Sequence, residues 1–178
     1  MKAVVCPQYG PPEVLTIQSV SKPVPADHEV LIKIHATTAH VGDTRIRRAD
    51  PFMVRFVFGL FKPQKNLIPG LEVSGVVEAV GEKVTDFKPG DQVFALTGFN
   101  LGGYAEYICL PDKSRAGSLE KKGMIAHKPT NLSYAEAATI PAGGLTALKN
   151  LQKAQLQAGQ KILINGASGS LGTFAIQL

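Results

Sequence analysis

Tryptophan is absent from this sequence of 178 residues, cysteine occurs only twice, and charged residues make up 19% of the chain. No run of 18 or more apolar residues is present, and the glycines follow no three-residue period. Neither a membrane-spanning helix nor a collagen-like chain is therefore predicted. Hydrophobic residues reach 44%, which is typical of a globular chain with a core rather than of a disordered one. The length suits one domain, or one domain with part of a second.

The two cysteines, Cys6 and Cys109, lie far apart in apolar, strand-like segments. They show neither the spacing of a metal site nor a CxxC redox pair, so we expect two buried structural thiols. The apolar run near the N-terminus is too short for the core of a secretory signal peptide. Together these features predict an intracellular chain in a reducing compartment, the cytoplasm.

Positive charge is in moderate excess, with a formal net charge of +5. The densest group of basic residues is Arg45, Arg47 and Arg48. No aromatic residues alternate with these arginines as they would in an RNA-binding sheet. A solvated arginine face is the simpler interpretation. We therefore expect a small-molecule substrate, with neither a nucleic acid nor a membrane as a partner.

The first two thirds of the chain have the pattern of an all-β domain. Short apolar or alternating segments are separated by glycine and proline, which favours a barrel or a sandwich. The predicted strands are residues 2–6, 14–20, 29–36, 73–80, 91–96 and 103–110. Residues 43–48 are expected to form a short helix. The apolar and aromatic segment 52–61 is either a helix or loop packed on the barrel, or the lip of an apolar substrate pocket.

The pattern changes near residue 130, after a polar segment (113–128) that we expect to be an exposed connection. Ser133 and Glu136 form the capping box of an alanine-rich helix, which Pro141 and the Gly143-Gly144 pair are expected to interrupt. A second helix then runs to about Leu156. Residues 161–165 (KILIN) predict a short buried strand of the parallel type, and a helix starts at Thr173. The order is therefore a barrel in residues 1–130, followed by the opening of an α/β domain in residues 131–178.

Between that strand and the last helix lies a glycine-rich turn with GxxGxxG spacing. Such a turn lets the backbone approach a pyrophosphate and lets helix and strand pack closely, and amides at the start of the helix bind phosphate oxygens. A simple tight connection between strand and helix is the alternative. The residues predicted to bind a nucleotide cofactor are Gly166, Ala167, Ser168, Gly169, Ser170, Leu171 and Gly172.

Several segments, in this order, resemble the medium-chain dehydrogenase/reductase superfamily and are most similar to its zinc-free quinone oxidoreductase (zeta-crystallin-like) branch. The resemblance covers essentially the whole chain. The matching segments are PGLEVSGVVEAVG (69–81), VTDFKPGDQV (84–93), GGYAEY (102–107), PAGGLTA (141–147) and NGASGSLG (165–172).

This resemblance implies a GroES-like barrel that carries the substrate site, followed by a truncated Rossmann domain with its first βα unit. It implies NADPH between the two domains, with NADH not excluded, and a homodimer for the full-length form. Thr146 matches a threonine that lies near the nicotinamide in the family. Because a doubly wound domain needs about six strands and only one is predicted, we expect the 178-residue chain alone to be inactive.

The departures from the family's zinc-containing members concern His40 and Leu71, which occupy the positions of a cysteine and a histidine ligand. A single imidazole makes no zinc site, so no zinc is expected. His40 either donates a hydrogen bond or a proton to a substrate oxygen, or simply orients Asp43 and its loop. His40 and Asp43 are the candidate catalytic residues, although Asp43 could equally hold the loop together. Glu72 is expected to be structural.

Three functions remain open from the sequence. The first is the N-terminal part of a reductase that transfers hydride from NADPH to a quinone, enone or carbonyl, for which absence of zinc favours easily reduced substrates. The second is a non-catalytic binding or scaffold module. The third is an enoyl-thioester reductase, in which the three arginines would meet an anionic substrate.

Overall fold

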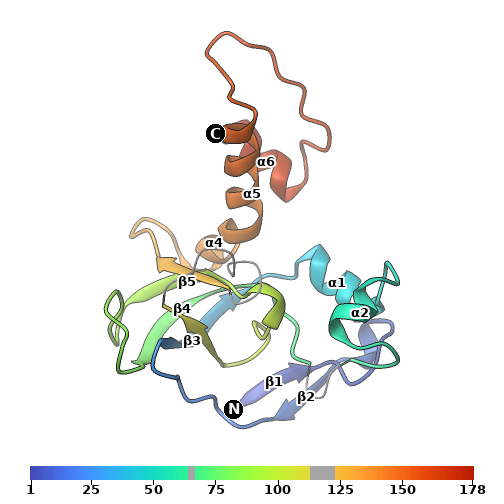
Figure 1. The fold of residues 1–178 in the computed structure, drawn as a ribbon, viewed down its shortest axis with the longest axis vertical. Helices are drawn as coiled ribbons and strands as arrows, with labels where there is room; N and C mark the ends of the chain where they lie inside the picture. The colour runs from blue at the N-terminus through green and yellow to red at the C-terminus, as the bar shows by residue number, and fades with distance from the viewer. Residues whose placement is uncertain (64–66, 113–122) are drawn as a thin grey trace.

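A computed structural model describes residues 1–63, 67–112 and 123–178. Within these residues, seven strands form two antiparallel arrangements, a pair β1-β2 and a curved sheet in the order β6-β3-β4-β5-β7, which resembles half of a barrel (Figure 1). The strands are β1 (Lys2–Val5), β2 (Thr16–Ser19), β3 (Glu29–Thr37), β4 (Glu72–Val80), β5 (Gln92–Leu96), β6 (Tyr107–Pro111) and β7 (Met124–His127). A bridge between Ala3 and Ala105 joins the smaller pair to the segment that precedes β6.

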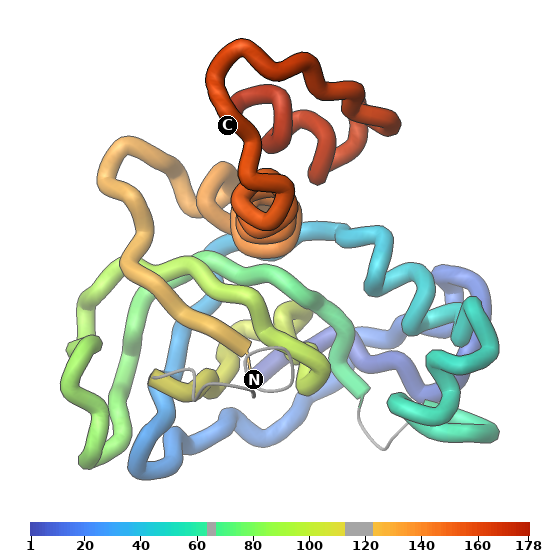
Figure 2. The backbone as a smooth tube through the Cα atoms, turned by 45° about the horizontal axis from the view of Figure 1, so that its top comes forward, coloured from blue at the N-terminus to red at the C-terminus, as the bar shows by residue number. Residues whose placement is uncertain are grey.

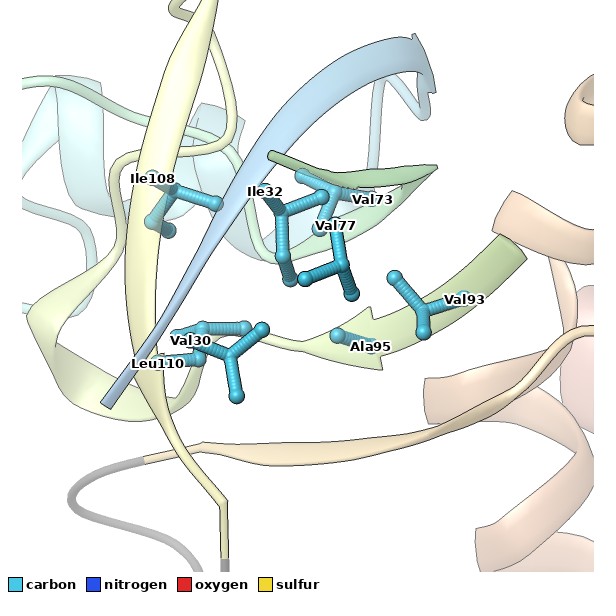
Figure 3. Packing of buried hydrophobic residues seen from close by; sticks show 8 residues of the cluster. All are labelled: Val30, Ile32, Val73, Val77, Val93, Ala95, Ile108 and Leu110. Carbon is cyan, nitrogen blue, oxygen red and sulfur yellow. The ribbon is translucent and has the colours of Figure 1, made fainter. Parts of the chain in front are cut away.

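The main core lies inside the curve of the larger sheet. β3 forms ladders with both β4 and β6, so its apolar side chains meet partners from both neighbours: Ile32 is opposite Val77 on one side and Ile108 on the other. Figure 3 shows the eight side chains of this cluster, which come from β3, β4, β5 and β6. β-branched residues dominate it, as expected where side chains pack on a pleated surface.

A second apolar cluster lies below the two short helices α1 (Val41–Arg48) and α2 (Val54–Phe58). It contains Cys6, which is fully buried as predicted, whereas Cys109 on β6 is only half-buried. Burial raises the pKa of the Cys109 thiol to about 11 and also raises the pKa of Cys6. Both thiols are free.

Most predicted strands are confirmed, with three differences. β2 covers only residues 16–19 of the predicted 14–20, and β6 begins at Tyr107 rather than at Gly103. β7 was not predicted, because residues 113–128 were expected to be an exposed connection. Residues 113–122 lie outside the described part of the chain, but residues 124–127 pair with β5. The pattern of β7 is weak because an edge strand with half-exposed side chains needs no strict alternation.

Three helices follow the sheet: α4 (Tyr134–Ala138), α5 (Ile140–Lys153) and α6 (Ser170–Gln177). The predicted capping box is confirmed, since Ser133 Oγ accepts from Glu136 N and Glu136 Oε2 accepts from Ser133 N. α4 lies on β3 and β4, α5 rises from the sheet, and α6 packs beside α5 (Figures 1 and 2). Within the described residues, no helix combines the length and apolar character needed to cross a bilayer.

The expected division into two helices is confirmed, because α4 ends at Ala138 and α5 begins at Ile140, but the break lies at Thr139 and not at Pro141 or the two glycines. Pro141 lies in the first turn of α5, where a missing N–H costs nothing. Gly143 and Gly144 continue the helix because Phe174 of α6 packs against them. α5 ends at Lys153, slightly before the predicted Leu156.

The predicted strand at residues 161–165 is also wrong as a strand in this chain. These residues have no regular secondary structure and form no ladder with any described segment, and Leu163 is 93% exposed. A parallel strand of this apolar type requires neighbours on both sides and cover on both faces. The predicted helix after the glycine turn is present as α6, three residues earlier than expected.

Candidate functional site

His40 and Asp43 lie together at the start of α1. His40 caps the helix: its Nδ1 accepts a hydrogen bond from Gly42 N at 3.0 Å, and its own backbone N donates to Asp43 Oδ2 at 3.1 Å. Since Nδ1 accepts, the proton of the neutral imidazole lies on Nε2. The structure therefore supports the loop-orienting role of His40 and leaves Nε2 as its hydrogen-bond donor.

Asp43 is almost fully buried, with 5% of its surface exposed. Oδ1 accepts from Gly70 N at 2.8 Å, while Oδ2 accepts from His40 N and from the hydroxyl of Tyr104, both at 3.1 Å. Burial raises the pKa of Asp43, and these three donors oppose that effect. The Asp43 carboxylate thus connects three chain segments by hydrogen bonds, which agrees with the expectation that it holds the loop together.

Two glycines of the family-like segments, Gly70 and Gly103, allow the backbone segments around Asp43 to lie close together. Gly70 has φ +105°, and a Cβ atom there would lie 2.6 Å from Tyr104 N, so only glycine fits. Gly103 N donates to Gly70 O at 3.0 Å and closes the contact. Tyr104 then donates toward Thr38 O and Asp43, and burial next to that carboxylate strongly raises the pKa of its hydroxyl. The sequence marked this segment but did not single out Tyr104 as the residue that supports the loop.

Glu72 connects this loop to the helices. It is 3% exposed, and its two oxygens accept from different elements: Oε2 from Thr38 Oγ1 at 2.6 Å, and Oε1 from Ala142 N at 2.7 Å. Ala142 lies in the first turn of α5, where the amides have no partner inside the helix and the helix dipole favours a negative charge. The structural role expected for Glu72 is therefore to connect, through these two hydrogen bonds, the loop that contains His40 with the start of α5.

Thr146 is exposed one turn after Ala142, since residues four apart share a helix face. It borders a cavity of about 300 Å³ together with Leu96, Met124 and Ala142. A larger groove of about 880 Å³ lies between β5, β7, α5 and α6, but its lining is mainly apolar and includes none of His40, Asp43 and Thr146. We place the candidate site on the side of the smaller cavity, because its lining includes Thr146 and the Ala142 that Glu72 binds, although neither His40 nor Asp43 lines it.

The glycine-rich turn is built as expected for close backbone packing. Gly166 has φ +76°, and a Cβ atom at Gly172 would overlap Gly166 O and the backbone of Ala167. α6 begins after Gly169, and the exposed residues Ser168, Gly169, Ser170 and Leu171 surround its first amides. Such amides suit a phosphate group, so the residues present fit the pyrophosphate of a dinucleotide.

The start of α6 also lies close to the start of α5. A Cβ atom at Gly143 would overlap Ser170 Oγ, and Gly143 directly follows Ala142, the residue held by Glu72. The loop containing His40 and Asp43, the first turns of α5 with Thr146, and the glycine turn are thus linked through Glu72 and Gly143. Within the described residues, no hydrogen bond joins His40 to the glycine turn directly.

Arg45, Arg47 and Arg48 do not form one exposed cluster in the folded chain. Arg47 is buried and its guanidinium donates to Gly10 O, whereas Arg45 and Arg48 remain exposed. Among the described residues, no group of three or more His, Cys, Asp or Glu side chains is arranged to hold a metal ion. The expectation of no zinc remains a prediction.

Residues 26–121 match the family of the alcohol dehydrogenase GroES-like domain. The whole chain is 39% identical to a quinone oxidoreductase from Sus scrofa and 33% identical to an NADPH-dependent alkenal/one oxidoreductase, chloroplastic, from Arabidopsis thaliana, and covers 49% and 44% of these proteins. The structure of a quinone oxidoreductase from Coxiella burnetii superimposes with a TM-score of 0.85 at 32% identity, over 99% of this chain and 52% of that one.

The chain therefore spans about half the length of the curated relatives that it matches. These relatives are oxidoreductases, and the curved antiparallel sheet with its short helices is the GroES-like fold that the motifs implied. With a family match over more than half of its residues, the chain belongs to the alcohol dehydrogenase GroES-like domain family, within the medium-chain dehydrogenase/reductase superfamily.

Proposed function

We propose that this chain forms the substrate-binding half of a zinc-independent, NADPH-dependent reductase that transfers hydride to a quinone, an enone or a related carbonyl compound. Residues 1–130 are the barrel domain in this proposal, and residues 131–178 begin a Rossmann domain. Two free cysteines without metal or disulfide spacing support a place in the cytoplasm.

The observation that carries the proposal is the double hydrogen bond of Glu72. It places the loop with His40 beside the helix with Thr146, which are the segments predicted to meet substrate and cofactor. The similarity to a quinone oxidoreductase and to an alkenal/one oxidoreductase supports the substrate class, and the printed name of the second relative supports NADPH.

NADPH, when bound, supplies the hydride. The backbone of Gly169, Ser170 and Leu171 would hold its pyrophosphate, and Thr146 would hold its nicotinamide end. His40 has its Nε2–H available to donate a hydrogen bond to a substrate oxygen, because Nδ1 is occupied by Gly42 N. Asp43 keeps the loop in place rather than contacting substrate.

The zinc-independent part of the proposal rests on the donor set. Leu71 occupies a position where zinc-containing relatives have a ligand, and a leucine side chain cannot coordinate a metal. Without a Lewis acid, hydrogen bonding by His40 is the polarising interaction that the loop offers, which favours substrates that are reduced easily.

The test measures oxidation of NADPH at 340 nm with 1,4-naphthoquinone and with a small enone. A form extended to the length of the relatives should reduce one of them with and without EDTA, and the 178-residue chain should not. His40→Ala in the extended form should lower kcat by tenfold or more, whereas His28→Ala, just before the opposite end of β3, should not. Binding of NADPH without turnover would support the scaffold alternative, and loss of activity with EDTA that zinc restores would refute zinc independence.

A further inference from the structure

The outer face of α2 and its flanks is apolar and exposed. Phe52, Met53, Phe56 and Phe61 all lie on the surface, and Phe56 and Phe61 are 70% and 88% exposed. The inner face is also apolar, because Phe58 belongs to the second core cluster and Val54 packs against it. Large apolar side chains that gather on a surface usually mark a place where a partner covers them, so the outer face needs an explanation.

This face is held by the fold and is not a loose loop. The hydroxyl of Tyr9 donates to Gly59 O at 2.7 Å, and the Arg55 guanidinium donates to Leu60 O at 3.1 Å. The same guanidinium lies over the Tyr9 ring at 4.8 Å. The rings of Phe52 and Phe56 meet edge to face, with centroids 5.8 Å apart. The four exposed side chains are therefore presented on a fixed support.

The surroundings of this face are positively charged. Arg45 and Arg48 on the adjoining α1 and Lys62 next to Phe61 are exposed, and none of them forms an ion pair with any described residue. Between residues 41 and 63 the sequence has only two acids, of which Asp43 is buried and Asp50 exposed. An apolar surface bordered by basic side chains suits a lipid bilayer with anionic head groups.

A second copy of the chain is a poorer match for the same surface. In a symmetric dimer the same patch meets itself, so the basic border of one copy would face the basic border of the other. Anionic head groups instead neutralise this border while the acyl region receives the phenylalanine rings. In Figure 1, α2 lies at the side of the half-barrel, next to α1 and away from α5 and α6.

We propose that the exposed face formed by Phe52, Met53, Phe56 and Phe61, with its border of Arg45, Arg48 and Lys62, docks the protein on an anionic phospholipid surface. The inference is independent of the proposed reductase activity. It departs from the expectation of no membrane partner, because the sequence of segment 52–61 could not reveal which of its apolar residues point outward.

Binding to sucrose-loaded vesicles tests this proposal by cosedimentation. Vesicles of 30% phosphatidylserine in phosphatidylcholine should bind the chain, and vesicles of phosphatidylcholine alone should bind it at least tenfold less. Met53→Ser with Phe61→Ser should lower the partition coefficient on the mixed vesicles by about tenfold, since two large apolar groups no longer enter the interface. Ile17→Ser with Val24→Ser is the matched control, because both residues are exposed apolar side chains elsewhere.

The basic border has its own variant and control. Arg48→Glu reverses one charge at the patch and should lower the partition coefficient by about tenfold or more, because each basic residue near the surface contributes about 1 kcal/mol. Lys153→Glu makes the same change at the exposed end of α5 and should have little effect. Far-UV circular dichroism checks that every variant is folded.

Equal vesicle binding by the wild type and the Met53/Phe61 variant would overturn the proposal, as would equal binding to neutral and anionic vesicles. Absence of vesicle binding, combined with a dimer in sedimentation equilibrium that the same variant abolishes, would assign the face to self-association instead.

Discussion

Replacing Glu72 by alanine tests the connection on which the candidate site depends. The substitution removes two hydrogen bonds to a buried carboxylate, from Thr38 Oγ1 at 2.6 Å and from Ala142 N at 2.7 Å. Hydrogen bonds to a charged group contribute about 1.5–3 kcal/mol each, and the Ala142 amide loses its partner. We expect Glu72→Ala to lower the free energy of unfolding by about 3 kcal/mol, a large fraction of the stability of a typical domain.

Glu72→Gln separates hydrogen bonding from charge. A glutamine can accept from Ala142 N through its oxygen and donate through Nε2 to the hydroxyl of Thr38, which rotates to accept. Both contacts then persist, and only the charge beside the helix N-terminus is lost. The expected loss is about 1 kcal/mol, well below that of the alanine variant.

The assay is urea denaturation followed by circular dichroism, together with hydrogen exchange of the Ala142 amide, which should become faster in Glu72→Ala. Glu78→Ala is the control on the same strand, because Glu78 is exposed and paired with Lys22, and its effect should be much smaller. The reasoning fails if Glu72→Ala costs less than about 0.5 kcal/mol, the range of an ordinary surface substitution. It also fails if the glutamine and alanine variants lose the same amount.

Four further predictions concern groups near the site and in the sheet. Burial raises the pKa of Asp43, so the difference in the free energy of unfolding between the wild type and Asp43→Asn should be greatest below the ordinary carboxyl pKa. This difference should fall as the pH rises through the raised pKa. Urea denaturation at several pH values between 3 and 8 measures it, and a difference that grows with pH would contradict the expectation. Tyr104→Phe should cost about 1 kcal/mol, and a double-mutant cycle with Asp43→Asn should give a coupling above about 0.5 kcal/mol, whereas additive effects would argue against their hydrogen bond. Gly172→Ala should speed hydrogen exchange throughout the glycine turn, since a Cβ there overlaps Gly166 O, and unchanged exchange would show that the turn has room. Because burial raises the pKa of the Cys109 thiol to about 11, iodoacetamide at pH 8 should modify the native protein far more slowly than the urea-unfolded one, and equal rates would refute this.

Local signals were predicted well because their partners are neighbours in the chain. The capping box at Ser133 and Glu136 needs only a three-residue spacing, and it is present with both hydrogen bonds. The alternation in residues 29–36 and the apolar segment 73–80, which Gly81 ends, predicted the two strands β3 and β4, which pair with each other in the sheet. The ordered motifs predicted the GroES-like fold in the same way.

Other features depended on partners that are distant in sequence. Gly143 and Gly144 continue a helix because Phe174 packs on them, and residues 161–165 form no strand because no described strand lies beside them. β7 exists only through its ladder with β5. Propensity alone cannot decide such cases, since tertiary packing overrides it.

The candidate site likewise combines residues that the sequence marked with contacts that only the folded structure shows. The sequence marked the glycine turn by its spacing, whereas His40, Asp43, Glu72 and Thr146 were marked by the resemblance of their segments to the family. Only the tertiary structure decided that Asp43 accepts hydrogen bonds from three donors. It also decided that Glu72 connects the loop to a helix residue 70 positions further along the chain. A buried carboxylate must find hydrogen-bond donors wherever folding brings them, and which donors those are follows from the packing of the sheet against α5.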